Sequence, residues 1–323
     1  MSFFDDIGKI PDLIGKIPDV IEKIPDDIEK ISGDIKNLPL TTAFNLLLSS
    51  TWNRENTGHI PGYEDINFTS GDNCNLSGWI YRTPGQDNHR GTVFLLHGFC
   101  DNSLSMKWVA EGLSQNYNIT ALAFDHRYHG NSSKGHHFPT FGGQEAYDVE
   151  AAMDYADKIG LPKPYILYGV SLGGMSGQKA GLEDKRVSGV FMLSVPGWPW
   201  HAIGINAYIA TPVANLINDS YNWDILRSGD IRTLSQPWDH RPLVCYLMGD
   251  KDRYDIYPTM TIFKHWHNGE SGGYDISIKD NLGINKFFYR VNGAIHPDVP
   301  GYQVWDWDRF HLVKSEFFNR ILK

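Results

Sequence analysis

The chain has 323 residues, of which 41% are hydrophobic and 21% charged, and its formal net charge is −9. This length supports one large domain with a substantial core, and the acidic balance argues against a nucleic-acid partner and against electrostatic docking on anionic lipid. The odd cysteine count, without metal-ligand spacing, predicts neither a disulfide framework nor a zinc site. We expect no cofactor and no metal. Because no basic and apolar leader and no run of about 18 apolar residues occurs, we expect an intracellular protein.

The first forty residues repeat with a seven-residue period. Isoleucine recurs in an a/d heptad pattern over residues 7–36, at 7, 14, 21, 28 and 35 and again at 10, 17, 24 and 31. Proline at 11, 18 and 25 opposes a smooth coiled coil, because each ring removes a helical donor. The pattern predicts short helical turns that begin at the prolines. Their apolar stripe needs a covering surface, which is a partner or a second copy, a membrane surface, or the protein's own body.

Residues 41–323 are expected to form the main domain, with 38–57 as the connector. A hairpin is predicted over 63–82. Short apolar runs typical of parallel strands buried on both faces follow at 92–97, 119–124, 165–170, 189–194, 243–248 and 286–291. Helices are predicted between them at 103–115, 143–159, 173–181, 258–267 and 303–322. This alternation indicates an α/β protein with a mostly parallel, doubly wound sheet. Residues 195–240 break the rhythm and predict a lid insertion, with a helix near 203–217, over the carboxyl ends of the strands.

Gly169-Val170-Ser171-Leu172-Gly173 fits the pattern Gly-x-Ser-x-Gly. The bare pattern is weak evidence, but it lies between a predicted strand and a predicted helix, which is the context of a nucleophile elbow. The helix amino terminus behind the serine would favour developing negative charge. A glycine-rich turn whose serine only caps a helix is the alternative interpretation.

Two further motifs accompany the elbow, Leu95-Leu96-His97-Gly98-Phe99 and Asp125-His126-Arg127-Tyr128-His129-Gly130-Asn131-Ser132. With them, residues 60–323 resemble the α/β-hydrolase superfamily, in particular its monoacylglycerol-lipase and lysophospholipase-like esterases. The resemblance implies an oxyanion hole built from the main-chain amides of Phe99 and Leu172, with Cys100 as an alternative to Phe99. Asp148 also matches a usual position. Tyr128 stands where the family usually has glycine.

The order of a catalytic triad in this fold is serine, acid, histidine, which makes the other two members searchable. After the apolar run 243–248, the resemblance selects Asp252, with Asp250 and Asp255 as rivals. His296 follows the last predicted strand and is the candidate base, although a lone loop histidine is ordinarily a surface residue. His97 is interpreted as structural. The pairs at 136–137 and 265–267 lack the acidic or cysteine partners of a metal site.

These residue types predict acyl transfer, in which the imidazole takes the serine proton, the carboxylate orients the imidazole and two N–H groups stabilise the oxyanion. A serine nucleophile disfavours the aspartate-based dehalogenase and epoxide-hydrolase branches and the cysteine-based dienelactone branch. Trp198, Trp200 and Tyr208 of the insertion are candidate contacts for a hydrophobic acyl group, unless they form the lid's own core. We expect hydrolysis of a small-molecule or lipid carboxylic ester. The alternatives are a thioesterase or acyltransferase, or a non-catalytic scaffold that uses the heptads.

Overall fold

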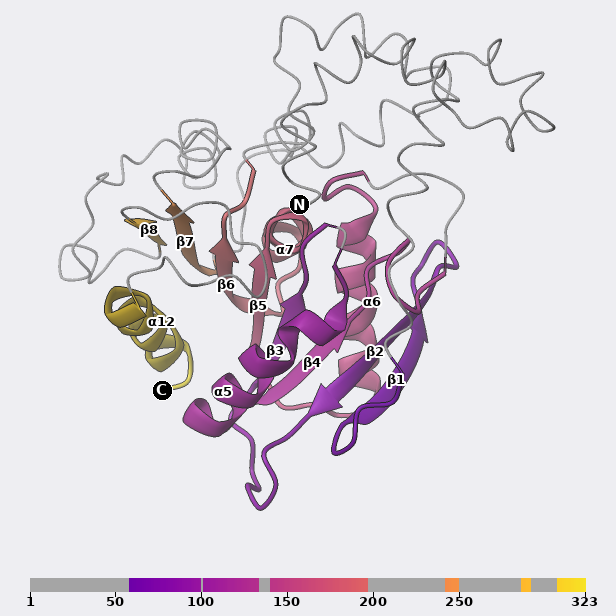
Figure 1. Ribbon diagram of the computed structural model, residues 1–323, viewed down its shortest axis with the longest axis horizontal. Coiled ribbons are helices and arrows are strands. Elements are labelled where there is room, and N and C mark those ends of the chain that lie inside the picture. The colour runs from indigo at the N-terminus through magenta and orange to yellow at the C-terminus, as the bar shows by residue number, and fades with distance from the viewer. Residues whose placement is uncertain (1–57, 100, 134–139, 197–241, 250–285, 292–306) are drawn as a thin grey trace, which may run out of the picture.

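The computed structural model describes residues 58–99, 101–133, 140–196, 242–249, 286–291 and 307–323. These residues build one eight-stranded sheet in the order β1-β2-β4-β3-β5-β6-β7-β8 (Figure 1). The strands are β1 (Glu64–Thr69), β2 (Asn75–Tyr81), β3 (Thr92–Leu96), β4 (Thr120–Phe124), β5 (Tyr165–Val170), β6 (Val187–Leu193), β7 (Leu243–Gly249) and β8 (Lys286–Val291). Each apolar run predicted as a strand is a strand in the structure.

Strand directions confirm the mostly parallel sheet. Strand β2 runs antiparallel to both of its neighbours, β1 and β4, and the predicted hairpin is present with Glu64 opposite Ile80. From β4 through β8 every adjacent pair is parallel. The carboxyl ends of β3 to β8 therefore lie at one edge of the sheet, which is where ligands bind in doubly wound folds.

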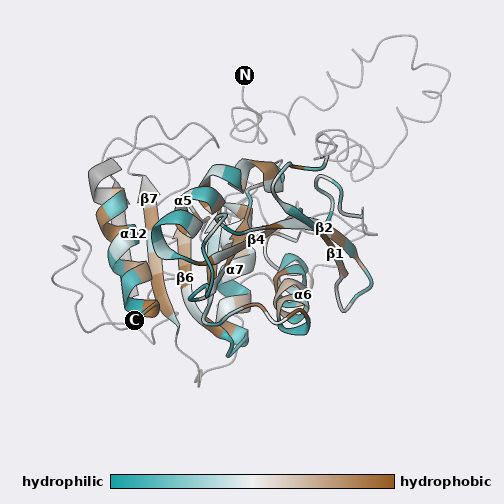
Figure 2. Cartoon of the chain, turned by 90° about the horizontal axis from the view of Figure 1, so that it is seen from below, coloured by the Kyte–Doolittle hydropathy of each residue, from teal (hydrophilic) through white to brown (hydrophobic). Residues whose placement is uncertain are grey.

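Helices cover both faces of the sheet, and this explains the unbroken apolar character of its central strands. Helices α6 (Glu145–Lys158) and α7 (Leu172–Glu183) pack on one face, and α5 (Lys107–Tyr117) and α12 (Trp307–Ile321) pack on the other (Figure 1). Every residue of β3, β4 and β5 is buried. The strands form an apolar centre, and the helices turn their hydrophilic faces outward (Figure 2).

The helix predicted over 103–115 has two parts. It begins as a short 3₁₀ turn, η3 (Ser103–Met106), in which the Asn102 side chain accepts a hydrogen bond from the amide of Leu104. It continues as α5 to Tyr117 and ends at Asn118, whose φ of 51° is left-handed. Asparagine tolerates this conformation better than most residues, which explains the helix end.

Several predicted segments lie outside the described residues. They are the heptad segment 7–36, the connector 38–57, the helix 258–267 and all but the first two residues of the insertion 195–240. Within the described part of the chain, no helix has the length and apolar character needed to cross a membrane.

Candidate active site

Ser171 lies at the sharp turn between β5 and α7. Its φ of 50° and ψ of −112° place it in a region that residues with a side chain rarely adopt. Main-chain hydrogen bonds hold it there, because the amide of Ser171 donates to Leu193 O at 3.0 Å and the amide of Met175 donates to Ser171 O at 3.0 Å. The predicted strand, turn and helix of a nucleophile elbow are therefore present.

Two glycines, Gly169 and Gly173, allow this turn to form. A β-carbon on Gly169 would lie 2.5 Å from Gly173 O, and one on Gly173 would lie 2.6 Å from His97 O, so each position has room only for hydrogen. A β-carbon on Gly98 would lie 3.7 Å from the Ser171 Cβ, which is an ordinary contact. The His97–Gly98 turn therefore lies directly against the candidate nucleophile.

The two candidate oxyanion donors belong to the segments on either side of this contact. Phe99 follows Gly98 and is 5% exposed, while Leu172 is the first residue of α7. The first amides of a helix have no acceptor within the helix, so they are available to an anion. Cys100, the alternative to Phe99, lies outside the described residues.

The predicted acid and base, Asp252 and His296, also lie outside the described residues, as do Trp198, Trp200 and Tyr208. The described strands nevertheless fix where the chain enters these segments. Strand β7 ends at Gly249 and β8 ends at Val291, and both run parallel to β5 through the intervening strand β6. The segments that carry Asp252 and His296 thus start from the sheet edge at which Ser171 follows β5.

His97 is structural, as predicted. Its Nδ1 lies 2.8 Å from Gly98 O, which can only accept, and its Nε2 lies 2.9 Å from the amide of His126, which can only donate. The ring is therefore neutral with its proton on Nδ1. Complete burial is the main reason that the pKa of His97 lies well below its usual value, and the neighbouring rings of His126 and His129 lower the pKa further. Its Nε2 is engaged with the main chain, so His97 is not the general base.

The loop after β4, Asp125–Ser133, packs against this turn. The rings of His126 and His129 lie 4.9 Å and 5.1 Å from the His97 ring, measured between centroids. Burial lowers the pKa of His129 to about 4. Across the residues that the structure describes, no group of three His, Cys, Asp or Glu side chains is placed to hold a metal ion.

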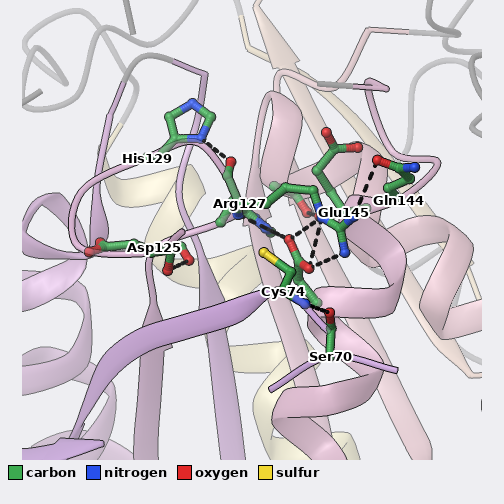
Figure 3. Close-up of polar contacts among 12 residues, drawn as sticks. Ser70, Cys74, Asp125, Arg127, His129, Gln144 and Glu145 are labelled. Atoms are coloured by element: carbon green, nitrogen blue, oxygen red, sulfur yellow. Dashed lines mark hydrogen bonds and ion pairs between the residues drawn. The ribbon is translucent and has the colours of Figure 1, made fainter. Parts of the chain in front are cut away.

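Arg127 anchors the same loop to the body of the protein. Its guanidinium is buried, with Nη2 2.6 Å from Asp148 Oδ1 on α6 and Nη1 2.6 Å from Asp72 Oδ2 in the β1–β2 turn. Nη1 also donates to Gln144 Oε1 at 3.2 Å (Figure 3). Burial alone would lower the pKa of Arg127, but the two carboxylates outweigh it and raise the pKa. The position of Asp148 that the family resemblance singled out is thus the partner of a buried cation.

Tyr128, the departure from the family pattern, has a φ of 69°. Glycine adopts this left-handed conformation without a steric penalty, whereas a residue with a β-carbon does so at a cost of about 1–2 kcal/mol. The structure therefore gives a physical reason for the usual glycine, and it shows that Tyr128 adopts a left-handed conformation in this chain.

Sequence reasoning did not assign a role to Asp125. Its carboxylate accepts the amides of Ser103 at 2.7 Å and Asn131 at 2.8 Å, and it is completely buried. The signal in the sequence was an aspartate immediately after a buried strand and before a turn rich in Gly, Asn and Ser. That signal predicts main-chain hydrogen bonding, although it does not reveal that one donor comes from a segment 22 residues earlier.

Comparison with known proteins agrees with this architecture. Residues 87–233, a little under half of the chain, match the model of the family described as serine aminopeptidase, S33. No curated protein sequence matches the chain. The esterase Pf2001 of Pyrococcus furiosus has a TM-score of 0.59 and 20% identity, with coverage of 83% of this chain and 98% of that one.

Two further solved structures have similar folds. The α/β hydrolase GrgF from Penicillium sp. sh18 has a TM-score of 0.57 and 15% identity, with coverage of 81% of this chain and 99% of that one. Est1E from Butyrivibrio proteoclasticus, with ferulic acid bound, has a TM-score of 0.53 and 16% identity, with coverage of 79% of this chain and 97% of that one. At these identities the likeness concerns the fold. The sheet order, the elbow at Ser171 and these similar structures together show that the chain has the α/β-hydrolase fold.

Proposed function

We propose that the protein is a serine hydrolase that cleaves a carboxylic ester with a hydrophobic acyl group. The observation that carries the proposal is the backbone of Ser171, which is held at φ 50° and ψ −112° between β5 and α7. Strain of this kind persists only where the surrounding structure enforces it, and it is concentrated at functional sites. A serine that merely capped a helix would need no such conformation.

In the proposed reaction, Ser171 Oγ attacks the carbonyl carbon of the ester while its proton passes to the imidazole of His296. Asp252 orients that imidazole and stabilises its charged form. The amides of Phe99 and Leu172 stabilise the oxyanion of the tetrahedral intermediate, which collapses as the alcohol leaves with the proton from His296. Water, activated by the same imidazole, then hydrolyses the acyl-enzyme.

The choice of an ester rests on two arguments. A serine nucleophile in this fold is typical of acyl transfer, and the solved structures of similar fold include the esterase Pf2001. The aromatic residues Trp198, Trp200 and Tyr208 are the proposed contacts for the acyl group, because apolar and aromatic side chains make up most of the lining of small-molecule sites.

Labelling with a fluorophosphonate tests the nucleophile. We expect stoichiometric modification of the wild-type chain and none of Ser171→Ala, with Ser176→Ala as the matched control. Ser176 lies on the same helix, and its hydroxyl donates to Gly173 O at 3.0 Å. An unlabelled wild type would contradict the proposal and favour a non-catalytic scaffold.

A substrate panel then separates the reaction classes. It pairs p-nitrophenyl esters of increasing acyl length with the matching thioesters and with aminoacyl p-nitroanilides, the last because of the family description serine aminopeptidase. We expect the largest kcat/KM for an ester, with an increase from acetyl to longer acyl groups. Preference for a thioester or an anilide would reassign the reaction while the nucleophile stays the same.

A further inference from the structure

We propose that Asp125 is a positioning residue of the oxyanion hole, since its carboxylate fixes the segment that carries the amide of Phe99. This inference rests on the proposed function, because it concerns the same site. The carboxylate of Asp125 accepts main-chain amides, so its effect on the site passes through the main chain.

The loop after β4 holds the Phe99 segment on both sides. Before Phe99, His97 Nε2 accepts the amide of His126 at 2.9 Å. After Phe99, the amide of Ser103 donates to Asp125 Oδ1 at 2.7 Å. Two consecutive residues that follow β4, Asp125 and His126, therefore hold the segment at His97 and at Ser103.

Asp125 is itself immobilised. Its amide donates to Ser77 O at 2.8 Å on β2, and its carbonyl accepts the hydroxyl of Ser132 at 2.5 Å. The second carboxylate oxygen accepts the amide of Asn131 at 2.8 Å. A β-carbon on Gly130 would overlap the carboxylate, so the loop closes tightly around it. Figure 3 shows Asp125 on the far side of the loop from the Arg127 anchor.

The side chain of Phe99 is supported from the same loop. The Phe99 ring meets the His129 ring edge-on, with centroids 5.9 Å apart, and His129 Nδ1 lies 2.9 Å from Arg127 O (Figure 3). The Arg127 anchor connects this contact to Asp148 on α6. The Phe99 ring and the downstream end of its segment thus both contact the same loop, and Asp125 is the residue that bonds directly to that end.

Oxyanion stabilisation depends on where the donors point, which is why such fixing matters. Removal of one donor typically costs about 10²–10³ in rate, and a displacement of about 1 Å can cost as much as 10². Because the donor acts on charge that develops only in the transition state, a misplaced donor should lower kcat and leave substrate binding nearly unchanged.

Asp125→Asn is the principal test. Asparagine keeps the size of the side chain and one acceptor oxygen, but its amide end cannot accept the second N–H. We expect kcat per fluorophosphonate-titrated active site to fall about 10-fold or more, with KM changed less than about threefold. Affinity for a trifluoromethyl ketone, which forms a tetrahedral oxyanion on the serine, should fall by the same factor as kcat/KM.

Asp157→Asn is the matched control. The substitution is chemically the same, but Asp157 lies at the opposite end of the sheet. Its carboxylate accepts the hydroxyl of Tyr165 at 2.8 Å and forms ion pairs with Arg186 and Lys163. It should lower thermal stability without changing kcat or the affinity for the ketone. A merely structural role for Asp125 would make the two variants behave alike.

Gly130→Ala provides a second variant that retains the carboxylate and its charge. The added methyl group must displace the carboxylate of Asp125, so we expect the same selective loss of kcat and ketone affinity per titrated site. If both loop variants keep kcat and ketone affinity within twofold of an active wild type, the inference is wrong although the proposed function stands. If the wild type itself neither labels nor hydrolyses esters, the proposed function fails and the inference fails with it.

Discussion

The main-chain carbonyl of Leu96 occupies the place where a β-carbon on Gly173 would stand. The amino-terminal turn of α7 can lie against the end of β3 only because residue 173 has no side chain. This close approach brings the His97–Gly98 turn to the candidate nucleophile, and it joins two motifs that are 75 residues apart in the chain.

Gly173→Ala should therefore disrupt both the fold and the site. The obstructing atoms are backbone, which cannot rotate away, so we expect a loss of about 3 kcal/mol in the free energy of unfolding and loss of fluorophosphonate labelling. Urea denaturation measures the first effect. Gly112→Ala is the control, because a β-carbon there meets nothing within 4 Å on α5. It should stabilise the protein by about 0.5–1 kcal/mol, and an equal response of the two variants would contradict the packing argument.

The buried ion pair of Arg127 with Asp148 should be strongly coupled. Arg127→Met leaves the buried carboxylate of Asp148 uncompensated, which costs about 3–5 kcal/mol. Asp148→Asn should cost less, because Arg127 keeps its ion pair with Asp72. The double variant should be more stable than the sum of the two losses predicts. Lys163→Ala removes an exposed pair with Asp157, so it should cost no more than about 1 kcal/mol. Additive losses in a double-mutant cycle by urea denaturation would show that the pair is not coupled.

Tyr128 should carry backbone strain that glycine relieves. Tyr128→Gly and Tyr128→Ala remove the same ring, but alanine keeps the β-carbon that makes the left-handed φ of 69° costly. We expect the glycine variant to be more stable than the alanine variant by about 1 kcal/mol. Thermal denaturation of the two proteins compares them directly, and a more stable alanine variant would rule out strain at this position.

Stability should fall as the pH is lowered from 7 towards 4. Burial holds the pKa of His97 well below 6.5 and lowers that of His129 to about 4, so the unfolded chain binds more protons than the native one in this range. Unfolding is therefore favoured as pH falls, with a slope of up to about 1.4 kcal/mol per pH unit for each histidine. The full stabilisation is present above about pH 7.

His129→Asn tests the origin of this slope. The asparagine amide can replace the Nδ1 donor to Arg127 O but does not titrate. Urea denaturation between pH 5 and 7 should give a shallower dependence for the variant than for the wild type. An unchanged slope would assign the pH dependence to other groups.

Association with a partner or a second copy is one of three interpretations of the heptad pattern over residues 7–36. We expect deletion of residues 1–38 to lower the number of chains per particle, obtained from the mass measured by light scattering, because the apolar stripe that mediates association is removed. Ester hydrolysis should stay unchanged. Loss of vesicle binding instead would favour the membrane alternative. No change in either measurement would contradict both, and would leave only docking on the protein's own body.

The sequence by itself determined the strands and the elbow. Residues of β3, β4 and β5 are apolar without interruption, and a strand buried on both faces requires this pattern, so local composition was enough to find them. The elbow was also predictable, because the glycines around Ser171 lie between a predicted strand and a predicted helix. The start of the predicted helix at 103 as a 3₁₀ turn was missed, because one side-chain cap at Asn102 decides it.

Only the tertiary structure decided the neighbours of the site. The bond from Ser103 to Asp125 and the pairing of Arg127 with Asp72 and Asp148 join residues that are 21 to 55 positions apart. No local sequence pattern predicts such contacts, because they depend on which strands are neighbours in the sheet. The physical reason is that the spacing of apolar residues and the local composition indicate which residues are buried. A hydrogen bond between residues distant in the chain depends on the path of the whole chain.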